Sequence, residues 1–415
     1  MISTRMTISP HSKFAITFVF VTVLLDMVGF GLIIPVQPAL ISQVAHVDVA
    51  HASIIGGWMF FAFSAGQFLL GPTLGNLSDA FGRRPLLLLA VFGLGCDYLI
   101  TALAPSLGWL FVGRTLAGVL GSSYIIANAY IADITPPEGR AKAFGMMGAA
   151  FGLGFVIGPA IGGLLGSFGP RVPFFVAAAI SLLNFAFGYF VLPETLPPEK
   201  RRSFDPARAN PVGTFRIFAR YPKVLPLCIA LFMYFFATSV YPAIWPFWGT
   251  ARFGWNPATI GITLAAFGLI MAITQATLVG PTVKRLGEWR AALLGMGAAA
   301  IGTLLFGLSG SLVAVLLTLF IHAPECFVHP MLTAIMSKTV PDDAQGELQG
   351  GISAIMNIAM MLGTVFYSQA FGYFLQPNPF MVSASAGFFV AFALVSVTFV
   401  YLLLSGNEEI NNKLS

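Results

Sequence analysis

Charged residues are scarce in this sequence. Asp, Glu, Lys and Arg make up only 9% of its 415 residues, whereas 57% are hydrophobic. A soluble protein carries roughly 25% charged residues, so too little polar surface exists here to cover a water-facing globule. The scarcity excludes an ordinary soluble domain and indicates that lipid is the main solvent. The 44 glycines agree, because Gly is commoner in membrane helices than in soluble ones.

Cysteine is scarce too, and Cys96, Cys228 and Cys326 all lie in apolar segments. This excludes a secreted disulfide framework and favours core-like side chains. The net charge of +5 comes from basic residues in short hydrophilic stretches, so we expect no nucleic-acid partner. We also expect no cleaved signal, because the apolar stretch after Lys13 runs for about 25 residues without a small-residue cleavage site.

Long apolar stretches are present instead. A helix needs roughly 20 mostly apolar residues to cross a bilayer. Twelve such stretches occur, at 14–38, 52–73, 85–104, 108–131, 141–166, 172–192, 224–247, 257–281, 288–308, 312–337, 346–373 and 379–404. The sequence therefore predicts an all-α membrane protein with 12 transmembrane helices.

A longer hydrophilic segment, rich in Lys and Arg, divides the chain. We expect an N-terminal six-helix bundle over 1–192, a cytoplasmic basic linker over 193–223, a C-terminal six-helix bundle over 224–404 and a cytoplasmic tail over 405–415. Basic residues concentrate in cytoplasmic loops. With both chain ends inside, 18 of the 21 basic residues are cytoplasmic, which predicts an N-in/C-in multi-pass protein of the cell inner membrane.

The two halves repeat at an offset of 205 residues. The segment 75–82, GNLSDAFG, corresponds to 280–287, GPTVKRLG, and Pro136 corresponds to Pro341. One offset that fits separate junctions indicates internal duplication. It predicts two pseudo-symmetric six-helix bundles around a central axis, with substrate bound between them near the bilayer midplane.

The loop between the second and third spans carries a specific pattern, which continues into a basic pair. Gly75 and Gly82 allow a tight turn, and Asp79 is spaced to pair with Arg83, which Arg84 follows. We expect a latch that closes in one conformation and opens in another. The alternative is a solvated basic loop that only sets the topology.

The fifth span has glycines four residues apart, at Gly154, Gly158 and Gly162, with Pro159 among them. Such glycines line one helix face and let helices approach closely, and a proline removes one backbone hydrogen bond. The Gly-Pro-x-x-Gly-Gly arrangement resembles the antiporter motif of drug/proton exporters, and this resemblance implies export rather than uptake. The alternative is ordinary small-residue packing.

Ionisable residues inside spans are the sharpest indications of function, because charge in lipid is costly. Asp26 lies 13 residues past Lys13, about 20 Å along a helix, where a carboxyl could exchange protons near neutral pH. Arg114 cannot lose its proton, so it is a counter-charge. The alternative is a fixed Asp26–Arg114 pair. Asp97 is assigned to coupling or to structure, and Glu325 to coupling.

The tenth span carries His322, Glu325 and His329, whose spacing places them on one helical face, and Pro324 and Pro330 could open the backbone beside them. They could form a protonation switch. They could also bind a substrate or a metal, or make ordinary interhelical hydrogen bonds. We favour a protonation switch or substrate binding over ordinary interhelical hydrogen bonds, and we rank a metal site well below the first two.

Other polar and aromatic residues are weaker candidates. Tyr234 is deep enough in its span to line a pocket, whereas Trp245 and Trp248 fit an interfacial belt. Gln67 and Asn128 are polar positions inside spans that could bind substrate or a neighbouring helix.

Taken together, these segments resemble the tetracycline/proton antiporters, a drug/proton antiporter family of the major facilitator superfamily. The matching segments are LDMVGFGLIIPVQP at 25–38, the loop 75–85, the pair Asp97-Tyr98, GRTLAG at 113–118, YIADIT at 130–135, the span-five motif, 280–287 and QGELQG at 345–350. The match is dense in the first half and patchy in the second.

The resemblance implies the major facilitator fold and proton-coupled export. It also implies coupling or substrate roles for Asp26, Gln67, Asp97 and Arg114, and gating roles for Asp79 and Arg83. Two departures are clear. The eighth span has no histidine, and the tenth carries His and Glu where those exporters are small and apolar. Tetracycline as the substrate therefore does not carry over.

We predict a proton-coupled antiporter that exports a small organic molecule or drug by alternating access. The alternatives are uptake, transport of a sugar, siderophore or metal chelate, and a non-transporting receptor. No nucleophile–base or metal constellation of an enzyme is visible in the sequence. We expect no cofactor and no bound metal. The expected partners are a small-molecule substrate, protons and the lipid bilayer, and the functional unit is expected to be a monomer.

Overall fold

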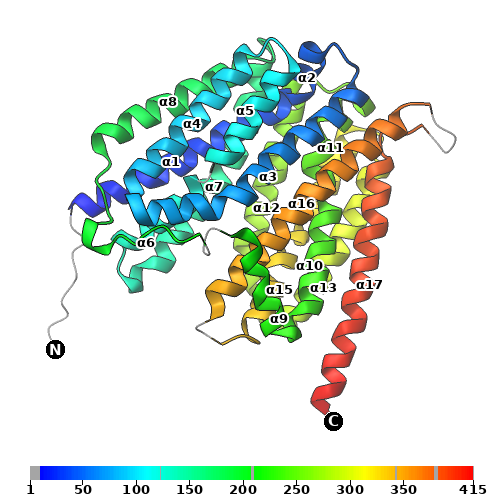
Figure 1. Cartoon of the computed structure of the whole chain (residues 1–415). Helices are drawn as coiled ribbons and strands as arrows, with labels where there is room; N and C mark the ends of the chain where they lie inside the picture. The colour runs from blue at the N-terminus through cyan, green and yellow to red at the C-terminus, as the bar shows by residue number, and fades with distance from the viewer. Residues whose placement is uncertain (1–9, 122, 207–209, 342–343, 378–381, 415) are drawn as a thin grey trace.

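The computed structural model describes residues 10–121, 123–206, 210–341, 344–377 and 382–414 (Figure 1). This part of the chain consists of helices and connecting segments, without strands. Twelve of its helical segments are long and apolar enough to cross a membrane. The predicted all-α architecture with twelve spans is therefore confirmed. The N-in/C-in orientation and the domain boundaries remain predictions, and residues 1–9 and 207–209 of those domains lie outside the described residues.

Within the described residues, the first half contains eight α-helices. They are α1 (Pro10–Ile33), α2 (Gln37–Ala45), α3 (Val49–Phe81), α4 (Arg83–Leu103), α5 (Leu107–Leu120), α6 (Ser123–Ile134), α7 (Pro137–Gly166) and α8 (Val172–Val191). A 3-10 turn, η1 (Ile34–Val36), joins α1 to α2 at Pro35, because proline cannot continue the regular hydrogen-bond ladder. The first span therefore runs through α1, η1 and α2.

The second half follows the linker, whose elements are η2 (Pro198–Lys200), η3 (Pro211–Phe215), α9 (Arg216–Arg220) and η4 (Pro222–Val224). Its helices are α10 (Leu225–Thr238), α11 (Val240–Phe253), α12 (Pro257–Thr277), α13 (Val279–Leu308), α14 (Leu312–His322), α15 (Val328–Ser337), α16 (Gln345–Leu375) and α17 (Ala386–Leu414). The tenth span is broken by η5 (Ala323–Phe327), which has Pro324 in its first turn.

The 205-residue repeat holds in the backbone. Gly82, between α3 and α4, has φ 110° and ψ 156°, and Gly287 has φ 76° and ψ 168° at the equivalent place inside α13. Positive φ is strained for residues with a Cβ, which explains why both loops place a glycine there. The fifth and fourteenth helices also begin at equivalent residues, Leu107 and Leu312.

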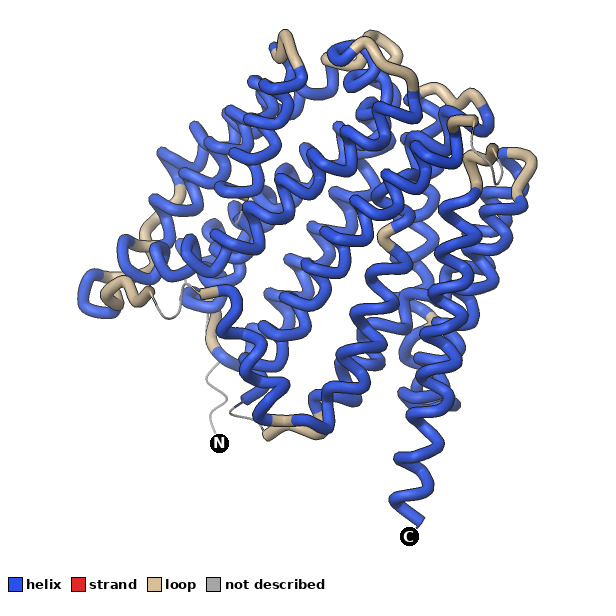
Figure 2. The backbone as a smooth tube through the Cα atoms, turned by 45° about the vertical axis from the view of Figure 1, so that its right-hand side comes forward, coloured by secondary structure: helices blue, strands red, loops and turns tan. Residues whose placement is uncertain are grey.

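The two halves meet through two pairs of long helices, α3 with α16 and α7 with α12. Figure 2 shows that long helices run side by side through the bundle. Near the start of α3, Gly57 packs directly on Ser368 of α16, so that no Cβ would fit there. Near the end of α7, Gly163 packs on Pro257 and Gly261 of α12. These contacts lie on the side of the bundle opposite the beginning of α1 and the end of α17 (Figure 1).

The glycine face of α7 packs on α1. A Cβ at Gly158 would overlap the carbonyl of Val28, and one at Gly162 would overlap that of Leu32. Close backbone approach of this kind is what small residues permit in membrane helices. The glycines of the span-five motif thus let α7 pack on α1 with one face and on α12 of the other half with a neighbouring face.

The linker touches both halves. In its first part, Arg202 N donates to Asp79 O at 3.1 Å, and Asn76 Nδ2 donates to Asp205 O at 2.6 Å. In its second part, α9 packs on the start of α16, where Phe218 contacts Gly351. The linker therefore lies across the side of the bundle that carries the chain ends.

Candidate functional site

A central cavity of about 410 Å³ lies between the two halves. Helices of the first half (α1, α2, α3, α5 and α7) and of the second (α10, α11, α12 and α16) form its wall, together with η1 and η5. Aromatic rings dominate the lining: Phe30, Phe60, Phe63, Phe155, Tyr234, Phe235, Tyr241, Trp245 and Phe267. Among the described lining residues the charged ones are Arg114 and Glu325, one from each half.

Arg114 reaches the cavity from α5 while paired with a carboxylate behind it. Its Nη2 contacts Asp97 Oδ2 on α4, and Asp97 is fully buried. Thr101 Oγ1 donates to the other oxygen of Asp97 at 3.3 Å. Arg114 Nε is buried without a hydrogen-bond partner. The pair leaves a permanent guanidinium at the wall whose charge is largely balanced by Asp97.

Glu325 is held by two side chains of the second half. Tyr234 Oη donates to Glu325 Oε1 at 2.7 Å, and His322 Nε2 lies against the other carboxyl oxygen. Glu325 is 5% exposed and His322 is fully buried. The break of the helix at Pro324 brings His322, the last residue of α14, next to Glu325 in η5.

His322 is enclosed by aromatic rings. Its ring lies 5.0 Å from Tyr241 and 5.5 Å from Phe306, measured between ring centroids. His329, the third predicted member of this group, packs instead against Phe235, at 5.6 Å. Of the three predicted residues, the structure therefore joins His322 to Glu325 and leaves His329 apart from them. Among the described residues, no group of three His, Cys, Asp or Glu is placed to hold a metal ion.

Asp26 occupies a sealed position on α1. Its side chain is 3% exposed, and neither carboxyl oxygen makes a hydrogen bond of ordinary geometry. The hydroxyl of Ser123, at the start of α6, faces it. Asp26 does not line the central cavity, and Arg114 pairs with Asp97 rather than with it. The alternative of a fixed Asp26–Arg114 pair is therefore wrong.

Of the remaining predicted substrate residues, one lines the central cavity and two do not. Tyr234 lines the cavity, as expected. Gln67 instead donates to the carbonyl of Gly121 at 3.3 Å, which ties α3 to the gap between α5 and α6. Asn128 is half-buried on α6 and lies outside the cavity wall.

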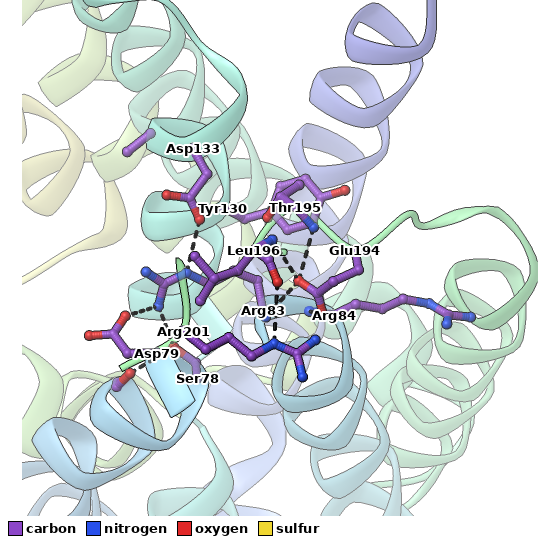
Figure 3. A network of polar contacts seen from close by, with 12 residues as sticks. Ser78, Asp79, Arg83, Arg84, Tyr130, Asp133, Glu194, Thr195, Leu196 and Arg201 are labelled. Carbon is purple, nitrogen blue, oxygen red and sulfur yellow. Dashed lines mark hydrogen bonds and ion pairs between the residues drawn. The ribbon is translucent and has the colours of Figure 1, made fainter. Parts of the chain in front are cut away.

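The predicted latch residues form a network at the start of α4 (Figure 3). Arg83 Nη1 lies 2.5 Å from Asp79 Oδ1, and Arg83 Nε lies 3.0 Å from Asp133 Oδ2 at the end of α6. Arg83 also donates to the hydroxyl of Ser78 at 2.7 Å. One guanidinium thus joins α3, α4 and α6. The side chain of Arg84, next in sequence, takes no part in these contacts, since its Nη2 donates to Tyr189 O on α8 at 2.6 Å.

Glu194, which was not among the residues predicted from the sequence, completes the network. Its carboxylate accepts from the backbone N–H groups of Arg83 at 2.9 Å and Arg84 at 3.3 Å (Figure 3). A carboxylate is favourable at a helix N-terminus, where N–H groups are unpaired. A Cβ at Gly82 would overlap this carboxylate. An acidic residue more than a hundred positions from the loop offers no spacing that would reveal the contact.

Trp245 and Trp248 are buried inside the bundle rather than at the membrane interface. They are 2% and 0% exposed, so the prediction of an interfacial belt is wrong. Trp245 Nε1 donates to Thr263 Oγ1 and Trp248 Nε1 to Ser385 Oγ, each at 3.1 Å. These partners lie on other segments, and they satisfy the indole N–H groups inside the bundle. Trp245 instead helps to line the cavity.

Comparison with known proteins identifies the family. The profile of the Major Facilitator Superfamily matches residues 19–364 and, in a second match, 227–412. The chain belongs to the major facilitator superfamily. Within that superfamily, the class C tetracycline resistance protein of Escherichia coli is 39% identical over 353 residues, which cover 85% of this chain and 88% of that protein. The resemblance inferred from the motifs is thus confirmed, and the tetracycline resistance proteins are the family to which the chain belongs.

Two further likenesses agree. Multidrug resistance protein 2 of Bacillus subtilis (strain 168) is 30% identical over 364 residues, covering 87% of this chain and 88% of that protein. The crystal structure of the nucleoside transporter NupG matches with a TM-score of 0.77 over 94% of this chain and 98% of its own, at 12% identity, which shows a shared fold. This member of the superfamily is a multi-pass membrane transporter rather than an enzyme.

Proposed function

We propose that this transporter is a proton-coupled antiporter that exports a small, partly aromatic organic molecule or drug. The observation that carries the proposal is the central cavity, in which aromatic rings of both halves surround a guanidinium from one half and a carboxyl from the other. Ligand sites of this type are mainly apolar, with a few polar groups that fix orientation. Relatives named for tetracycline resistance and multidrug resistance support a drug as the substrate.

Glu325 is the carboxyl for which substrate and proton compete. It lines the cavity, so a bound substrate meets its charge directly. Buried ionisable groups in a membrane are costly and mark function by default. Substrate binds while Glu325 is ionised, and a proton taken from the outer side weakens that binding. Tyr234 and His322 hold the carboxyl in place during the exchange.

Asp26 carries a proton at a site separate from the substrate cavity. A carboxylate in this position is poorly solvated when α1 is packed as observed, because burial removes it from water. Ionisation requires water or a partner, and hence a movement of α1 against α6. Proton release at Asp26 is thereby linked to a change of conformation.

Alternating access follows from rocking of the two halves. With the chain ends in the cytoplasm, the contacts of α3 with α16 and α7 with α12 close the outer side, and the cavity opens inward. The Asp79–Arg83–Asp133 network and the glycine face around Pro159 then act as the gating elements, together with Gly75, Gly82 and Gly158. We assign the functional unit to a monomer in the inner membrane.

The test is substrate-driven proton movement in proteoliposomes that hold the purified chain and a trapped pH indicator. Tetracycline and a panel of aromatic amphiphiles serve as probes. We expect at least one probe to drive proton movement in the parent chain, and Asp26→Asn to abolish it without loss of insertion. Glu199→Gln, at an exposed position of the linker, is the matched control. Full proton-driven export by Asp26→Asn would rule out this role.

A further inference from the structure

A second cavity lies on the outer surface of the first half, away from the substrate site. It occupies about 580 Å³ between α4 and α8, beside the beginning of α4. Leu88, Leu89, Phe92 and Phe185 form its apolar wall. Leu89 is 45% exposed and Phe92 is 41% exposed. Because both helices are membrane spans, this wall faces the hydrocarbon of the bilayer, where the acyl chains of lipids lie.

This second cavity is called the groove below, and its end beside the beginning of α4 is called its mouth. The mouth is cationic. Arg84 lines it, with its guanidinium 5.7 Å from the ring centroid of Tyr189. One donor of Arg84 is used by the carbonyl of Tyr189, at 2.6 Å. Its Nε is buried and has no hydrogen-bond partner. The side chain is therefore fixed at the mouth while one of its donors remains unused.

Arg201, on the linker, supplies a second guanidinium to the same mouth (Figure 3). Its Nε donates to Leu196 O at 3.3 Å, which folds the side chain toward the groove. The third ionisable residue there is Glu194. Its carboxylate accepts from four backbone N–H groups, those of Arg83, Arg84, Thr195 and Leu196. The helix terminus thus offsets the charge of Glu194, and the mouth keeps a positive surplus.

We propose that this groove binds an anionic phospholipid, with the headgroup phosphate between Arg84 and Arg201 and an acyl chain along the wall of Leu89 and Phe92. Guanidinium groups suit phosphate because their planar donors match its oxygens. Basic pockets at the ends of membrane helices are known positions for anionic headgroups. The groove joins a cationic mouth to an apolar flank, and this pairing fits an amphiphile better than a free phosphate ion.

The experiment is native mass spectrometry of the purified full chain with equal amounts of phosphatidylglycerol and phosphatidylcholine that have identical acyl chains. We expect the parent chain to retain phosphatidylglycerol preferentially. Each basic residue near a membrane surface contributes roughly fivefold to anionic-lipid affinity. Arg84→Gln and Arg201→Gln should therefore each lower phosphatidylglycerol occupancy about fivefold, and the double variant should lower it further. Lys142→Gln, at an exposed position of α7, is the matched control and should leave the preference intact.

Two results would overturn the proposal. One is equal retention of the two lipids by the parent chain, and the other is an unchanged preference in the double variant. Because Arg84 also holds Tyr189, Arg84→Gln could fold poorly. Arg201→Gln lies outside the spans and tests the site independently. Soluble glycerol phosphate is added as a third arm: if it displaces the lipid at equal concentration, the site recognises free phosphate and the lipid assignment fails.

Discussion

Arg83 and Glu288 occupy equivalent positions in the two halves, 205 residues apart, and form ion pairs of opposite polarity. Arg83 Nε lies 3.0 Å from Asp133, whereas a carboxylate oxygen of Glu288 lies 2.6 Å from Lys338 Nζ. Asp133 and Lys338 are also 205 residues apart. The duplicated fold has thus kept the contact between two helix ends and exchanged the signs of its charges.

A neighbouring contact repeats in the same way. Arg140 Nε donates to the carbonyl of Thr135 at 3.3 Å, and Gln345 Nε2 donates to that of Val340 at 2.9 Å. Each side chain satisfies a carbonyl at the end of the preceding helical segment. The equivalence therefore extends from the loop motif to the next junction, although the residue types differ.

The reversed pair predicts rescue by a double charge exchange. Glu288→Lys or Lys338→Glu alone places like charges together and should lower the thermal stability and the transport rate. Lys338 is an exposed partner, with 68% of its side chain accessible, so each loss should be about 1 kcal/mol or less. The combined variant should recover both properties, as measured by thermal unfolding in detergent and by transport in proteoliposomes. If the double variant is as impaired as the worse single one, the pair has no role of its own.

Gly82 should not tolerate a side chain. Gly82→Ala meets a positive φ and the carboxylate of Glu194 at once, and the backbone strain alone costs about 1 kcal/mol. We expect a lower unfolding temperature and slower transport. Gly145→Ala, where a Cβ would meet nothing within 4 Å, is the control and should remain close to the parent. Equal effects of the two substitutions would contradict the assigned role of Glu194 as a cap.

Asp97 and Arg114 should behave as one unit. Asp97→Asn leaves the buried Arg114 charge without its counter-ion, and breaking a buried pair typically costs about 3–5 kcal/mol. The double variant Asp97→Asn/Arg114→Gln removes both charges and should be more stable than Asp97→Asn alone. Thermal unfolding of Asp97→Asn, Arg114→Gln and the double variant gives the coupling energy between the two side chains. Additive losses would show that the two side chains act independently.

Glu325 should set the pH dependence of transport. Glu325→Gln cannot exchange a proton, so competition between substrate and proton at this carboxyl is removed, and both the pH dependence of export and the range of substrates should change. Tyr234→Phe keeps the carboxyl and should retain a pH-dependent rate. The measurement is initial rates of substrate transport in proteoliposomes of each variant. A parent-like pH profile in Glu325→Gln would remove this residue from the mechanism.

Asp48 gives a prediction for stability rather than transport. It precedes α3, where its side chain accepts from His51 N at 2.8 Å. This hydrogen bond, followed by that of the His51 ring, holds the pKa of Asp48 below its ordinary value of 3.8. A lowered folded-state pKa means that the stabilisation is complete above the unfolded pKa and is lost as the pH falls through the folded one.

Asp48→Ala should therefore cost up to about 1 kcal/mol at neutral pH, because an N-cap is lost at an exposed site. The deficit relative to the parent should shrink as the pH drops below about 4. Asp48→Asn, which still caps, should stay close to the parent at neutral pH. Unfolding temperatures measured across that range test the sign. A deficit that grows on acidification would contradict it.

The sequence by itself determined the twelve spans, the duplication and the positions of Asp26, Asp97, Arg114 and Glu325, because hydrophobicity, repeat offset and buried charge are legible along one chain. Only the tertiary structure decided which groups meet. Arg114 pairs with Asp97 and not with Asp26, and Glu325 takes Tyr234 as its donor. Such pairings depend on how each helix is rotated against its neighbours and where prolines break it, and one-dimensional spacing does not record this. For the same reason, the sequence did not predict that Glu194 caps the start of α4. It also placed Trp245 at the membrane interface, whereas Trp245 lines the cavity.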